Sequence, residues 1–139
     1  VIQIGANDCN SIGTLPEFEV PIITNCRDNI KRITEILNSR NIRTVFLTIF
    51  PVGSVPVYRL PFWSEKTRSY ISETNTMLSG YNSGNIRIVD CDPLFLENGK
   101  LKKTYAKDML HLNRGAYMKL NDQVKPYIET YIAEMRRRN

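Results

Sequence analysis

Residues 43–50 restrict the folds open to this chain more than any other stretch of it. They are mostly β-branched or aromatic, and Pro51 ends them, which is the pattern of a short buried strand. Apolar residues recur three and four positions apart in residues 22–39 and again in residues 62–78, which predicts an amphipathic helix on each side. A buried strand between two such helices is typical of α/β proteins, whose successive strands run parallel.

Two further strands and a third helix extend this alternation. Residues 1–4 and 86–90 are short apolar runs followed by turn or irregular segments, so both are predicted as strands. Asn113 is a predicted N-cap for a final helix, which Pro126 is expected to bend or split. The order strand, helix, strand, helix, strand, helix predicts a single domain over residues 1–139. We expect a three-layer α/β sandwich in which helices cover both faces of a parallel sheet.

Composition argues against several classes of protein. Hydrophobic residues make up 42% of the chain and charged residues 24%, and no apolar run approaches the roughly 20 residues that a membrane-spanning helix needs. Much of the net charge of +5 lies in the arginines at 136–138, so no nucleic-acid partner is expected. Three widely spaced cysteines indicate neither a zinc site nor a disulfide framework. We expect no cofactor and no membrane span, and the cysteines slightly favour a cytoplasmic compartment.

The only histidine of the chain, His111, stands three positions after Asp108. A carboxylate beside an imidazole can hold one ring nitrogen and leave the other free to act as a base. Ligands of parallel α/β sheets bind outside the carboxyl ends of the strands, and the segments that follow the predicted strands carry Asn7, Asp8, Asp108 and His111. We therefore expect these four side chains at one edge of the sheet. A structural or simply solvated histidine remains the alternative.

Two sequence blocks resemble those of a known family. Residues 4–8, Ile-Gly-Ala-Asn-Asp, are similar to the G-x-N-D block of the SGNH (GDSL-type) serine hydrolases. Residues 108–113, together with Gly115 and Tyr117, resemble the D-x-x-H block of that family and the start of its last helix. The resemblance covers essentially the whole chain and implies a flavodoxin-like three-layer fold.

The resemblance also implies a function and roles for the site residues. His111 would be the general base that deprotonates a serine, Asp108 would orient it, and the amide of Asn7 would donate to the oxyanion. Gly5 would allow a sharp turn before Asn7, and Asp8 would brace that turn. The implied activity is that of a serine esterase, or acyl hydrolase, which cleaves a small-molecule carboxylic ester with a small acyl group such as acetyl.

The family's G-D-S nucleophile block is absent from this sequence. Ser83 lies in a turn that precedes a predicted strand, whereas a nucleophile elbow must follow one. We expect the N-terminal strands and the nucleophile to lie on a removed segment or a second chain, so that this chain alone is inactive. The alternative is a non-catalytic interaction module that lacks the nucleophile. Nucleotide binding is less favoured, because no G-x-G-x-x-G or P-loop pattern follows any predicted strand.

Overall fold

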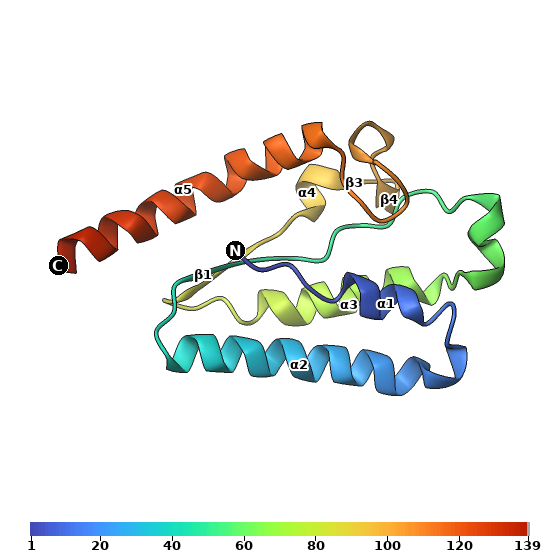
Figure 1. Ribbon diagram of the computed structural model, residues 1–139, viewed down its shortest axis with the longest axis horizontal. Helices are drawn as coiled ribbons and strands as arrows, with labels where there is room; N and C mark the ends of the chain where they lie inside the picture. The colour runs from blue at the N-terminus through green and yellow to red at the C-terminus, as the bar shows by residue number, and fades with distance from the viewer. Residues whose placement is uncertain (139) are drawn as a thin grey trace.

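Two parallel strands, β1 (Thr44–Leu47) and β2 (Ile86–Val89), lie at the centre of the molecule (Figure 1). The structure is a computed structural model and describes residues 1–138. The strands pair in register from Thr44 with Ile86 to Leu47 with Val89, and α3 (Lys66–Ser79) lies between them in the chain. All residues of β1 are buried, which explains the continuous β-branched and aromatic run in the sequence.

Helices pack against the two sides of this strand pair. Figure 1 shows α2 (Glu19–Ser39) and α3 on one side of the strands and α5 (Arg114–Arg138) on the other. Successive side chains of a strand point to opposite sides, so Phe46 packs with residues of α2 and α3, while Val45 and Leu47 pack with residues of α5. The helical periodicity of the sequence therefore corresponds to real buried stripes.

Short elements occupy the connections between these parts. They are helical turns and a two-stranded hairpin in the segments before and between the main strands and helices. These elements are α1 (Ala6–Ser11), η1 (Pro16–Phe18), η2 (Val57–Phe62), α4 (Asp92–Phe95), β3 (Leu96–Glu97), β4 (Lys100–Leu101) and η3 (Lys103–Tyr105).

The predicted three-layer sandwich is wrong for this chain. The structure is 59% helix and 11% strand, and β1 and β2 form a sheet of two strands only. The predicted first strand, residues 1–4, contributes one isolated bridge, in which the N–H of Ile2 donates to Val45 and the N–H of Leu47 donates to Ile2. This pairing does not continue beyond Leu47, because the N–H and the C=O of Ile49 are hydrogen-bonded to the side chain of Asn75 on α3.

The final helix begins as predicted but is not divided. Asn113 directly precedes α5, and its side-chain oxygen accepts the N–H of Ala116 at 3.0 Å, which confirms the predicted N-cap. Pro126 lies inside α5 without splitting it, so of the two predicted effects, a bend or a split, the split is wrong. The basic run at 136–138 lies at the end of α5, and the side chain of Arg138 is outside the described residues.

Cys9, Cys26 and Cys91 are free thiols, and all three are buried. None of the helices within residues 1–138 combines the length and the apolar character that crossing a bilayer requires.

Candidate functional site

His111 lies in a tight turn that a buried residue anchors. Ala106 and Leu112 form an antiparallel bridge, and the N–H of Lys107 donates to the carbonyl of His111 at 2.8 Å. Leu112 is only 2% exposed, whereas the side chain of His111 is 67% exposed. The buried Leu112 therefore anchors the backbone of the turn, while the imidazole is exposed to solvent.

Asp108 organises this turn with its carboxylate. Oδ1 accepts the backbone N–H groups of Leu110 at 2.8 Å and of His111 at 2.9 Å, as aspartates at the start of turns commonly do. The Nδ1 atom of the imidazole lies 2.9 Å from Oδ1 and 2.8 Å from Oδ2. The Leu110 N–H in the first place, and the His111 side chain with it, hold the pKa of the Asp108 carboxyl below its ordinary value.

This contact assigns different tasks to the two ring nitrogens. With Nδ1–H directed at the carboxylate, Nε2 is the nitrogen that can accept a proton from a substrate or nucleophile. Within residues 1–138 no hydrogen bond to Nε2 of His111 is formed. The contact therefore fixes the orientation of the imidazole and leaves its second nitrogen open.

Gly5 and α1 form the second half of the site. Gly5 precedes α1 with a φ of 96°, and a Cβ atom there would lie 2.9 Å from Cδ1 of Ile49. Glycine is the residue that tolerates both this backbone conformation and this close approach. Because Cys9 is the buried residue of α1, Asn7 and Asp8 on the same helix are directed outward and are exposed.

The two halves meet at one hollow of about 370 Å³, which we name the Asn7 hollow. Its wall includes Gly5, Asn7 and Asp8 from the first half and His111 from the second. The remaining lining residues are Gln3, Ile4, Ala6, Phe50, Val52, Ile71 and Leu110. The predicted site residues are thus brought together, while their chemical roles stay predictions.

No serine lines the Asn7 hollow. Ser83 lies in the turn before β2, where its backbone N–H donates to Ile86 and its hydroxyl donates to Asn38. That arrangement agrees with its interpretation as a turn residue. Among residues 1–138 there is also no group of three or more histidine, cysteine, aspartate or glutamate side chains that could hold a metal ion.

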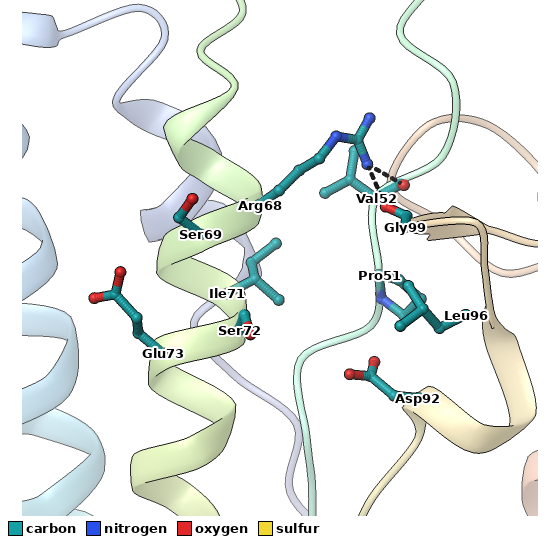
Figure 2. Close-up of a pocket in the computed structure, with 10 residues that line it drawn as sticks. All are labelled: Pro51, Val52, Arg68, Ser69, Ile71, Ser72, Glu73, Asp92, Leu96 and Gly99. Carbon is teal, nitrogen blue, oxygen red and sulfur yellow. Dashed lines mark hydrogen bonds between the residues drawn. The ribbon is translucent and has the colours of Figure 1, made fainter.

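Arg68 connects the site to α3, a contact that the sequence analysis missed. Its guanidinium donates to the carbonyls of Val52 at 2.6 Å, Gly53 at 2.8 Å and Gly99 at 3.4 Å. Figure 2 shows this side chain reaching from α3 toward the carbonyl groups of Val52 and Gly99. The N–H of Gly53 in turn donates to Met109 at 2.8 Å, inside the turn that carries His111. Nothing in the spacing of the sequence indicates this connection.

The same view contains a separate cavity of about 530 Å³ between α3 and residues 51–52 (Figure 2). It shares Val52 and Ile71 with the Asn7 hollow. Burial, and then the neighbouring Asp90, raise the pKa of the Asp92 carboxyl that lines it. This cavity therefore adjoins the predicted site across a wall of two apolar side chains.

No protein-family model matches this chain, and neither does any curated protein. The chain is similar in structure to a solved protein described as "a putative platelet activating factor from Streptococcus pneumonia", with a TM-score of 0.67 and 24% sequence identity. The match covers 90% of this chain and 56% of that one, so this chain spans little more than half of its length. At this identity the likeness concerns the fold alone.

Proposed function

We propose that this chain carries the histidine half of a serine esterase site of the SGNH type. The reaction would be hydrolysis of a carboxylic ester with a small acyl group such as acetyl. The observation that carries the proposal is the contact of Nδ1 of His111 with both carboxylate oxygens of Asp108, at 2.9 and 2.8 Å. It leaves Nε2 open on the rim of a hollow that also contains Asn7.

In this mechanism Nε2 of His111 takes the proton of a serine hydroxyl as the oxygen attacks the ester carbonyl. The side-chain amide of Asn7 donates to the oxyanion of the tetrahedral intermediate, and Asp108 stabilises the imidazolium that has formed. The imidazolium then returns the proton to the leaving alcohol. Water, deprotonated by the same nitrogen, attacks the acyl-enzyme and releases the acid and the serine.

The serine would come from a segment or a second chain outside these residues. Two features support such a partner. Within residues 1–138, the first residues of the chain pair on one side only, through the bridge of Ile2 to Phe46. Next to them lies a hollow of about 510 Å³, lined in part by Val1, Ile132 and Met135, that another segment could fill. The nonpolar residues there favour a partner with an apolar surface.

The direct test is His111→Ala in the full-length protein, with p-nitrophenyl acetate as substrate. We expect kcat to fall by about 10²–10⁴-fold, the range that general-base catalysis supplies. Lys107→Ala is the matched control, because this exposed side chain lies in the same turn and does not line the Asn7 hollow. Hydrolysis by His111→Ala at close to the unmodified rate would refute the assignment.

Asn7→Ala tests the oxyanion role separately. We expect kcat to fall by about 10²–10³-fold with little change in KM, because the interaction forms mainly in the transition state. Asn10→Ala, a change in the same helix that does not line the hollow, should leave kcat unaltered. An unchanged kcat in Asn7→Ala would remove that residue from the mechanism.

A second candidate function is a non-catalytic interaction module, and the absence of serine from the lining of the Asn7 hollow favours it. In that case the full-length protein would hydrolyse the ester no faster than buffer does. His111→Ala and Lys107→Ala would then give the same result as the unmodified protein.

A further inference from the structure

The imidazole of His111 lines a second hollow of about 470 Å³, which we name the Arg59 hollow. It shares only Leu110 and His111 with the Asn7 hollow, so the two hollows meet at these two residues. Its other lining residues are Ser54, Pro56, Tyr58, Arg59, Leu101, Lys103, Ala106, Asp108 and Met109. A molecule whose ester bond lies at Nε2 of His111 can therefore extend into both hollows.

The charged side chains that line the Arg59 hollow differ in whether they already have a partner within the chain. Its one carboxylate, Asp108, is directed at the backbone N–H groups of Leu110 and His111 and at the imidazole. Its two cations, Arg59 and Lys103, form no ion pair within residues 1–138. The charge that remains available to a ligand in this hollow is positive.

We propose that the Arg59 hollow binds an anionic group, a carboxylate or a phosphate, carried by the ester whose carbonyl lies at His111. This inference rests on the proposed esterase function and specifies its substrate class. The guanidinium of Arg59 offers a planar pair of N–H donors that match two oxygens of such a group, and Lys103 adds a second charge.

Neighbouring groups favour the same ligand. Tyr58 and Ser54 add hydroxyl donors, which an anion can use. Arg59 belongs to the short helix η2, where its N–H donates to the carbonyl of Pro56 at 2.9 Å. Lys103 is the first residue of η3 and comes two positions after the buried Leu101. The two cations thus belong to two short helices, η2 and η3, from different parts of the chain.

Binding can be tested without any hydrolysis. The probes are benzoate and phenyl phosphate, with benzamide as the neutral molecule of similar shape, and binding to the full-length protein is followed by NMR shifts of Tyr58, Arg59 and Lys103. We expect both anions to bind more tightly than benzamide, and Arg59→Gln to weaken that binding about tenfold. Arg32→Gln, a change of an exposed cation on α2, is the matched control and should bind as the unmodified protein does.

The two anions also distinguish the two possible sources of charge. Tighter binding of benzoate assigns the site to carboxylates, and tighter binding of phenyl phosphate assigns it to phosphates. Binding of benzamide as tight as that of both anions, or an Arg59→Gln variant that binds them as well as the unmodified protein does, would overturn the inference.

A kinetic pair tests the position of the anion relative to the ester. The substrates are 4-acetoxybenzoate and methyl 4-acetoxybenzoate, which carry the same acetyl ester with and without a charge. We expect kcat/KM to be higher for the charged ester. Arg59→Gln should lower kcat/KM for this ester about tenfold, mainly by raising KM. Equal hydrolysis of both esters, unaffected by Arg59→Gln, would overturn the anion site and leave the esterase standing. Anion binding without hydrolysis of either ester would overturn the esterase and leave the anion site standing.

Discussion

The two halves of the candidate site are held in place by different forces. Gly5 is buried against Ile49 and Cys26, and α1 is fixed by its buried Cys9, so the first half depends on packing. The second half, the turn with Asp108 and His111, is exposed and depends on hydrogen bonds to the Asp108 carboxylate. Changes in the first half should therefore alter stability most, whereas changes in the second half should alter chemistry at little cost in stability.

The largest effect on stability is expected for Gly5→Ala. The left-handed φ of 96° and the 2.9 Å approach to Ile49 together should cost about 2–4 kcal/mol of unfolding free energy. Gly84→Ala is the control, because no atom lies within 4 Å of its added Cβ, and it should stay within about 0.5 kcal/mol. Urea unfolding of both variants measures the difference, and equal midpoints would show that packing does not hold the first half.

Arg68→Met should have the next largest effect, because it removes the contact that joins α3, through Gly53, to the turn with Asp108 and His111. The carbonyl of Gly53 loses the guanidinium donor at 2.8 Å, which should cost about 1–2 kcal/mol. We also expect faster hydrogen exchange at the Gly53 N–H, which donates to Met109. Arg32→Met on the exposed side of α2 should change neither quantity. Unaltered exchange in Arg68→Met would show that the turn with His111 is held independently of α3.

Asp108→Asn should separate chemistry from stability. An amide oxygen can still accept the N–H groups of Leu110 and His111, and exposed ion pairs contribute little, so the unfolding free energy should change by less than about 1 kcal/mol. The amide no longer requires a proton on Nδ1, so the ring should shift toward the tautomer protonated at Nε2. Nitrogen-15 shifts of the imidazole measure the tautomer. A large loss of stability with no tautomer shift would contradict the view that the second half affects chemistry more than stability.

The smallest effect is a local transition at acid pH. Because the folded pKa of the Asp108 carboxyl lies below its ordinary value of 3.8, the charged form stabilises the turn above that value. This contribution is lost as the pH falls through the lowered pKa. The amide shifts of Leu110 and His111 should therefore change together below pH 3.8, and Asp108→Asn should lack this change. A midpoint above 3.8 in the unmodified chain would contradict the assigned hydrogen bonds.

Local patterns in the sequence were reliable guides to local structure. Periodicity located α2 and α3, the β-branched run located β1, and Asn113 was correctly predicted to cap α5. The extent of the sheet was not predictable in this way. Whether residues 1–4 form a strand depends on partners, and Asn75 takes the backbone groups of Ile49 that a longer strand would use.

The same division holds at the site. Asp108 and His111 are three residues apart, so their contact in a turn follows from the order of the amino acids. Other features of the site bring together segments that are distant in the chain. His111 shares a hollow with Asn7, Arg68 of α3 binds the carbonyl of Val52, and Arg59 and Lys103 line one hollow. Spacing carries no information on such contacts, because they arise only when helices and loops pack around a common core. The contact between Asp108 and His111 is thus encoded in a few adjacent residues, and packing alone assembles the hollows around it.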